Sequence, residues 1–92
     1  MRVIIEESAI ADIDGLAAWV AKDSPQRARS AVEHILETIE RLNLFPEMGH
    51  KGVEQGTYER VVSGTPYIVV YEIRKQSSAV LVIAVVHGAR ER

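Results

Sequence analysis

The stretch that decides the fold is "SPQRARSAVEHILETIERLNLFP", residues 24–46. Ser24 followed by Pro25 is a typical helix start, because serine caps free N–H groups and proline at the first helical position has none to leave unpaired. The helix is predicted to end at Phe45, since Pro46 disfavours the α conformation of the residue before it. Its apolar residues recur at steps of four and three, which predicts one buried face: Ala28, Val32, Ile35, Ile39 and Leu42.

A second helix is predicted just before this one. We expect Ser8 to cap its start, with Asp12 and Asp14 close to the positive end of the helix dipole. Few residues separate the two helices, which favours an antiparallel hairpin. The apolar face of the earlier helix is predicted from residues spaced by three and four: Ile10, Ile13, Ala17 and Val20.

Four segments have the β-branched and aromatic composition of strands, namely "RVIIE" at 2–6, "YERVV" at 58–62, "YIVVYEIR" at 67–74 and "AVLVIAVVH" at 79–87. Residues 46–57 contain three glycines and a proline and are predicted to form a loop. The order β-α-α-β-β-β predicts an α+β fold, in which a helical hairpin packs on a small antiparallel sheet. Residues 1–92 suit a single domain.

The last two strands do not alternate between apolar and polar residues. An antiparallel sheet with one wet face should alternate, so both faces of these strands are expected to be covered. The helical hairpin can cover only one face. A loop, the end of the chain or a partner could cover the other, and the sequence leaves these alternatives open.

Composition narrows the class of protein. The chain has 47% apolar and 26% charged residues and no cysteine, which excludes disulfides and thiolate metal sites. We expect no cofactor and no metal, because no histidines or carboxylates show ligand spacing. The apolar runs are far shorter than the ~20 residues of a membrane span, and no secretory signal is visible, so a cytoplasmic protein is expected.

Charge is divided unevenly along the chain. Residues 1–46 carry a net charge of −3 and residues 47–92 a net charge of +1. This is either chance or a basic face built by the second half of the chain, from Lys51, Arg60, Arg74, Lys75, Arg90 and Arg92.

Three motifs carry a resemblance to a known family: "A-x-x-D-I" at residues 9–13, "F-P-E-M-G" at 45–49, and "G-T-P-Y-I-V-V-Y" at 64–71 closing on "H-G-A-R" at 87–90. With them, the chain from about residue 5 to residue 92 resembles toxins of the RelE/ParE superfamily, the toxic halves of bacterial type II toxin–antitoxin modules. The resemblance implies one of two activities. RelE-like members are ribosome-dependent mRNA endoribonucleases, whereas ParE-like members poison DNA gyrase.

Two features favour the ParE branch. Nuclease members are similar to this chain in the third strand but have an arginine that faces the phosphate, where this chain has Ile68. Nucleases also tend to have an aromatic acid or base beyond the last strand, and no tyrosine follows Tyr71 here. The residues left for a rearranged nuclease site are Lys51, Arg60, His87 and Arg90. We expect His87 to cap or hydrogen-bond at its strand end, although its imidazole is the best acid–base candidate.

The resemblance also implies partners. We expect a cognate ParD- or RelB-like antitoxin to contact Trp19, Tyr67, Val69 and Tyr71, by helix-in-groove packing or strand addition. We expect DNA gyrase to contact Arg60, His87, Arg90 and Arg92. The alternative targets are the ribosome and mRNA, and a decayed toxin that binds only its antitoxin is a third reading.

Overall fold

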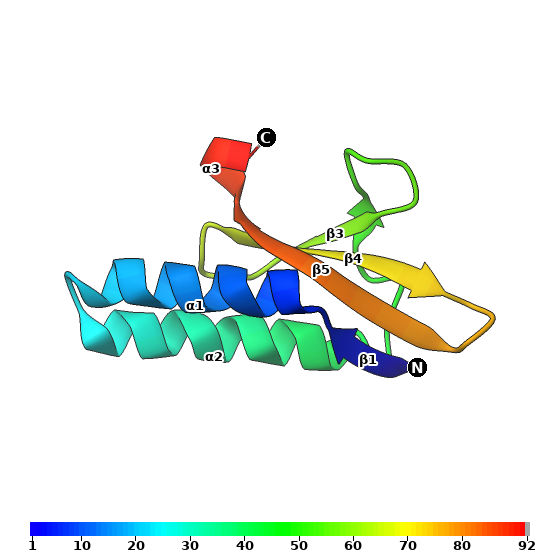
Figure 1. Cartoon of the computed structure of the whole chain (residues 1–92), viewed down its shortest axis with the longest axis horizontal. Coiled ribbons are helices and arrows are strands. Elements are labelled where there is room, and N and C mark those ends of the chain that lie inside the picture. The colour runs from blue at the N-terminus through cyan, green and yellow to red at the C-terminus, as the bar shows by residue number, and fades with distance from the viewer. Residues whose placement is uncertain (92) are drawn as a thin grey trace.

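The computed structural model describes residues 1–91, with side chains described through Ala89. Two long helices lie beneath a small sheet, and a short last helix lies on the other side of it (Figure 1). No helix of the described chain is long and apolar enough to cross a membrane. In chain order the elements are β1 (Arg2–Ile5), α1 (Glu7–Ala21), α2 (Pro25–Arg41), β2 (His50–Lys51), β3 (Tyr58–Val61), β4 (Tyr67–Arg74), β5 (Ala79–His87) and α3 (Gly88–Glu91).

The sheet has five strands in the order β1-β5-β4-β3-β2. The α+β fold and the helical hairpin are confirmed, but the sheet is mixed, because β1 pairs parallel to β5 while the other pairs are antiparallel. The hairpin brings the chain back to the end of the sheet where β1 started, so β3 runs like β1, β4 reverses and β5 runs like β1 again. The prediction also missed β2, which lies within the glycine-rich segment 46–57.

The start of α2 is confirmed. The Ser24 hydroxyl accepts a hydrogen bond from the Arg27 N–H at 3.1 Å, with Pro25 at the first helical position. The helix ends at Arg41 rather than Phe45, and a turn follows in which the N–H groups of Leu44 and Phe45 both donate to the Arg41 carbonyl. Pro46 disfavours the α conformation before it, and this effect extends over the whole turn at residues 42–45.

The prediction for the start of α1 is wrong. Glu6 occupies the cap position with no side-chain hydrogen bond, and Ser8 lies inside the helix. Of the predicted apolar face Ile13 is buried, but Ile10 is 47% exposed and Ala9 is fully buried in its place. A strand leads directly into α1 here, and pairing with β5 sets the rotation of the helix.

The core lies between the helices and one face of the sheet. The predicted residues Ile35, Ile39 and Leu42 of α2 are buried there, whereas Val32 is only half-buried and Ala31 takes its place. The residues of the sheet that pack in this cluster are Val62, Tyr67, Val69, Tyr71, Val80, Val82 and Val85.

The loop after α2 is tied to the sheet by Tyr71. The buried Tyr71 hydroxyl donates to the Pro46 carbonyl at 2.7 Å and accepts from the Gly49 N–H at 3.0 Å. A Cβ at residue 49 would lie 2.5 Å from the Glu59 carbonyl oxygen, so only glycine allows this approach. Burial raises the pKa of Tyr71 above its ordinary value of 10.0.

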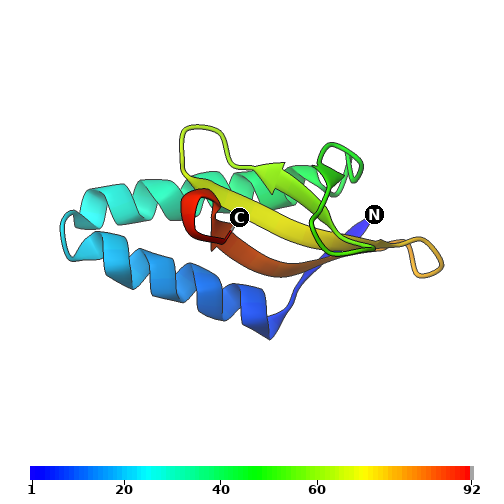
Figure 2. The same cartoon turned by 90° about the horizontal axis from the view of Figure 1, so that it is seen from above.

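The opposite face of the sheet is partly covered by the end of the chain. The Gly88 N–H donates to the Pro66 carbonyl at 2.8 Å, which holds α3 over the ends of β4 and β5 (Figure 2). Ile68 points to this face and is only 6% exposed, and a Cβ at Gly88 would lie 3.2 Å from its Cδ1. The sequence left a loop, the end of the chain or a partner as alternatives for covering this face, and the end of the chain covers this part of it.

Candidate functional site

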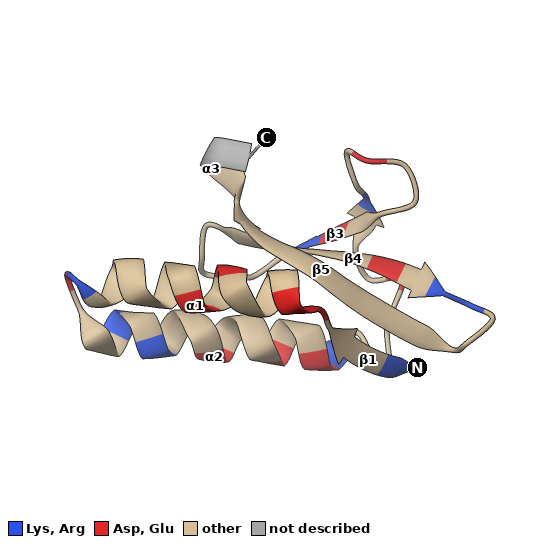
Figure 3. Ribbon diagram, in the orientation of Figure 1, with Lys and Arg blue, Asp and Glu red and all other residues tan. Residues whose placement is uncertain are grey.

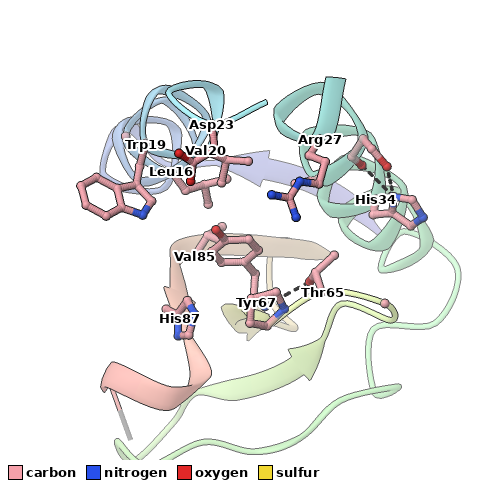
Figure 4. A pocket seen from close by; sticks show the side chains of 15 residues that line it. Leu16, Trp19, Val20, Asp23, Arg27, His34, Thr65, Tyr67, Val85 and His87 are labelled. Atoms are coloured by element: carbon pink, nitrogen blue, oxygen red, sulfur yellow. Dashed lines mark hydrogen bonds between the residues drawn. The ribbon is translucent and has the colours of Figure 1, made fainter. Parts of the chain in front are cut away.

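A cleft of about 660 Å³ lies between the helical hairpin and one end of the sheet. The helices extend beyond the sheet at the end where α1 meets α2 (Figure 1). The cleft lies under this overhang, opposite the β3–β4 turn and the end of β5. Figure 4 shows the side chains of both helices and of the sheet pointing into it.

One wall of the cleft comes from α1, through Gly15, Leu16, Trp19 and Val20. Trp19 is 60% exposed, and the Lys22 ammonium lies 5.0 Å from the centre of its ring. An exposed tryptophan has an apolar body available for a partner, and such residues dominate the energetics of interfaces. A Cβ at Gly15 would meet no atom within 4 Å, so this glycine does not serve close helix packing.

The facing wall comes from the sheet, where Tyr67 pairs with His87 across β4 and β5. Their ring centroids are 5.6 Å apart in an edge-to-face arrangement. The His87 Nδ1 accepts a hydrogen bond from the Ala89 N–H at 3.2 Å, which confirms the capping role expected at this strand end. With Nδ1 engaged as an acceptor, the neutral ring has its proton on Nε2.

The position of the β5 wall depends on two side chains of α1. β1 pairs only with Ala79–Val82, and past that point the register between β4 and β5 shifts at a bulge. There the Ser8 hydroxyl donates to the Ile83 carbonyl at 2.6 Å, and the Asp12 carboxylate accepts from the Val85 N–H at 3.0 Å. These contacts pair backbone groups that the end of β1 leaves open.

Sequence reasoning missed this role of Ser8 and Asp12. It interpreted both residues through the start of the helix, as a cap and as a partner of the dipole. The signal that could have found them is their spacing of four, which places both on one helix face. Asp12 is part of the "A-x-x-D-I" motif, but the partner of its carboxylate, the Val85 N–H, is 73 residues away in the chain.

The residues predicted to contact an antitoxin divide into two groups. Trp19 and Tyr67 both line the cleft. Val69 and Tyr71 are 0% exposed beneath the helices, so they support the core instead of forming a contact surface. The prediction is corrected for these two residues: in this sheet alternate residues of β4 face the hairpin, and the hairpin covers its middle.

The cations proposed for a nuclease site do not converge. Lys51 lies on β2, three strands from His87 in the sheet order, a separation of roughly 14 Å at about 4.8 Å per strand. Arg60 on β3 pairs with Val69, so it is two strands from β5, or about 10 Å. The Arg90 side chain and all of Arg92 lie outside the described residues.

A single basic face is not present among the described residues. Arg74 and Lys75 lie at the β4–β5 turn, the opposite end of β4 from Tyr67 and His87, and Arg74 pairs with Glu72 at 2.6 Å. Figure 3 shows basic residues distributed over several strands and acidic residues on both helices. The positive charge of the second half of the chain is therefore spread over the molecule.

The chemistry of the cleft is that of a recognition surface. Apolar and aromatic side chains make up much of its lining, and Asp23, Arg27 and His34 add polar groups, with the Arg27 side chain pointing into the cleft (Figure 4). Apolar grooves with a few polar groups are typical of sites that accept an amphipathic segment of another polypeptide.

Comparisons with known proteins agree with the fold. The family model described as "ParE toxin of type II toxin-antitoxin system, parDE" matches residues 3–92. A Sinorhizobium fredii protein named "Putative toxin Y4kP" is 29% identical over 83 residues, which cover 90% of this chain and 83% of that protein.

Two solved structures share the architecture. One belongs to a chromosomal ParDE toxin–antitoxin system of P. aeruginosa, with a TM-score of 0.81, 18% identity and coverage of 95% of both chains. The other is in the RelBE2 toxin–antitoxin complex of Mycobacterium tuberculosis, with a TM-score of 0.60, 23% identity and coverage of 94% of this chain and 95% of that chain. At these identities the structures show the fold, and the family follows from the match over almost the whole chain. The protein belongs to the ParE family of toxins from type II toxin–antitoxin systems.

Proposed function

We propose that this toxin acts by binding DNA gyrase and that a cognate antitoxin of the ParD or RelB kind neutralises it. The observation that carries the proposal is the environment of Ile68. This side chain stands where related nucleases have an arginine facing the phosphate, and it is buried against Gly88. An apolar side chain packed in this way cannot stabilise the charge that develops on a scissile phosphate.

The positions of the remaining cations support the same proposal. Metal-free RNA cleavage needs an acid, a base and a cation gathered around one phosphate. Lys51, Arg60 and His87 are on three different strands, and the Nδ1 of His87 is engaged by Ala89. Cations that are spread over several strands suit contact with a large target better than they suit catalysis.

The cleft supports the antitoxin half of the proposal. Trp19 and Tyr67 are on opposite walls of a largely apolar groove, where an amphipathic helix or extended segment could bury both. Arg90 and Arg92 remain candidates for contact with gyrase, together with Arg60 and His87.

Binding measurements with the purified chain test the target. Immobilised toxin is exposed separately to purified gyrase and to purified 70S ribosomes. We expect saturable binding to gyrase and none to ribosomes. Binding to ribosomes with positioned cuts in their mRNA would overturn the proposal in favour of a RelE-like endoribonuclease with an atypical site.

A further inference from the structure

A second, smaller cavity lies beside the cleft, between the C-terminal half of α2 and β3. Its volume is about 200 Å³. Arg41 enters it from the last turn of α2, and Arg60 enters from the helix-facing side of β3. The polar residues that line it are His34, Glu37, Thr38, Arg41, Arg60 and Ser63.

The two arginines of this cavity lack acidic partners in the described part of the chain. Between residues 1 and 89 the ion pairs within 4.0 Å join His50 to Glu59 and Arg74 to Glu72, and none reaches Arg41 or Arg60. Glu37 is the one carboxylate among the lining residues. Guanidinium groups keep their charge at all ordinary pH values, and Arg60 is half-buried, so the pair favours an anion between them.

The size of the cavity limits the anion. Pockets for whole small-molecule ligands are usually about 300–1,000 Å³, larger than this one. The space suits a single oxoanion group that projects from a larger molecule. Guanidinium groups bind carboxylate and phosphate through paired N–H donors, and the Ser63 hydroxyl can supply another.

The surrounding charge favours a carboxylate over a phosphate. Glu37 lines the cavity, and α2 also exposes Glu33 and Glu40. A nucleic acid binds through many phosphates at once, and these acids would repel its neighbouring phosphates. An acidic side chain of a polypeptide has a single charge and avoids this repulsion.

The cavity also adjoins the cleft at His34, which lines both. Its ring is fixed at their boundary by a hydrogen bond from Nδ1 to the Ser30 carbonyl at 2.7 Å (Figure 4). We propose that Arg41 and Arg60 bind the carboxylate of an acidic side chain of the polypeptide that occupies the cleft. The inference rests on the proposed function, because that polypeptide is the antitoxin.

The test uses the full chain and its cognate ParD- or RelB-like antitoxin. Their dissociation constant is measured by calorimetry for the wild type, Arg41→Gln and Arg60→Gln, with Arg29→Gln as control. Arg29 is exposed on α2 and lines neither cavity. We expect about a 10- to 100-fold weakening for Arg41→Gln and Arg60→Gln, the loss typical of a charged hydrogen-bond pair, and no change for Arg29→Gln.

The outcomes separate this inference from the proposed function. If Arg41→Gln binds the antitoxin with wild-type affinity, the carboxylate site is overturned and the proposed function is not. Arg41 is exposed, so its variant still gives the answer if a thermal melt shows that Arg60→Gln is unfolded. Weakened binding to a labelled DNA duplex with unchanged antitoxin affinity would assign the cavity to phosphate and also overturn it. Absence of any antitoxin binding by the wild type would overturn the antitoxin proposal and this inference together.

Discussion

At the scale of single residues, Tyr71 links distant parts of the chain. Its ring stacks on Tyr58 with centroids 5.7 Å apart, and its hydroxyl holds the backbone on both sides of the loop after α2. The family resemblance led us to expect that Tyr71 contacts an antitoxin. Complete burial shows that its hydroxyl serves the fold.

The burial of Tyr71 predicts a loss of stability in alkaline solution. Its folded pKa is raised by burial, and the Gly49 N–H and the Arg60 charge oppose this only in part. Above pH 10.0 the unfolded tyrosine loses its proton while the folded one keeps it, so the free energy of unfolding should fall as pH rises. Urea unfolding at about pH 8 and about pH 11 measures this fall. In Tyr71→Phe the fall should be smaller, and an equal fall would contradict the assignment.

In contrast to Tyr71, Trp19 is predicted to affect binding of the antitoxin and not the stability of the fold. Because it is 60% exposed, Trp19→Ala should change the free energy of unfolding by less than about 1 kcal/mol. Its loss from the wall of the cleft should weaken antitoxin binding by about 30-fold or more, the effect of a hot-spot residue. Calorimetry and urea unfolding measure the two quantities. Leu36→Ala, exposed on α2 outside the cleft, is the control, and an equal effect there would remove Trp19 from the site.

At the scale of elements, the junction of α1 with β5 places one wall of the cleft. A hydrogen bond donated by the Ser8 hydroxyl and one accepted by the Asp12 carboxylate replace the pairing that β1 would have supplied beyond Val82. The register shift between β4 and β5 lies next to them, and a bulge of this kind bends the strand that carries it. Helix, bulge and cleft therefore depend on one another.

Asp12 should contribute more to the free energy of unfolding than Asp14, which is on the same helix. Asp12→Ala leaves the N–H of the buried residue Val85 without its partner, which should cost about 1–3 kcal/mol. Hydrogen exchange of the Val85 amide, followed by NMR, should become faster than in the wild type. Asp14→Ala, exposed on α1, should change neither quantity. Unchanged exchange at Val85 in Asp12→Ala would contradict the role of this carboxylate.

Gly15 should be replaceable with a gain in stability. It lies within α1, and a Cβ there would meet no atom within 4 Å. Alanine has the higher helix propensity, so Gly15→Ala should raise the free energy of unfolding by about 0.5–1 kcal/mol. Thermal or urea unfolding measures the gain. Gly56→Ala is the contrasting variant, because a φ of +86° disfavours alanine, and a loss at Gly15 would indicate that the helix needs glycine there.

Local signals predicted the helices and long strands well because their causes are local. Ser24 and Pro25 act within one turn of α2, and the stripe of Ile35, Ile39 and Leu42 follows the helix period. The parallel pairing of β1, the bulge in β5 and the burial of Val69 and Tyr71 all depend on contacts between segments far apart in the chain. No short window contains both partners of such contacts, so spacing arguments could not reach them.

At the scale of the whole molecule, the cleft brings together members of both predicted sets of contact residues. His87 was assigned to the target, and Trp19 and Tyr67 to the antitoxin, yet all three line the same cleft. Under the proposed function, an antitoxin in the cleft would cover part of the surface offered to gyrase. This arrangement would let binding of the antitoxin alone silence the toxin.

The measurement that most directly tests whether DNA gyrase is the target is the amount of gyrase-cleaved DNA formed with purified toxin. Supercoiled plasmid is incubated with gyrase and increasing concentrations of toxin, and the linear DNA is quantified after the protein is removed. We predict accumulation of cleaved DNA with wild-type toxin, less with the Arg90→Ala/Arg92→Ala double variant, and none once the antitoxin is added in equal amount. Absence of cleaved DNA at saturating toxin, while ribosome-bound mRNA is cut at defined codon positions, would contradict the account.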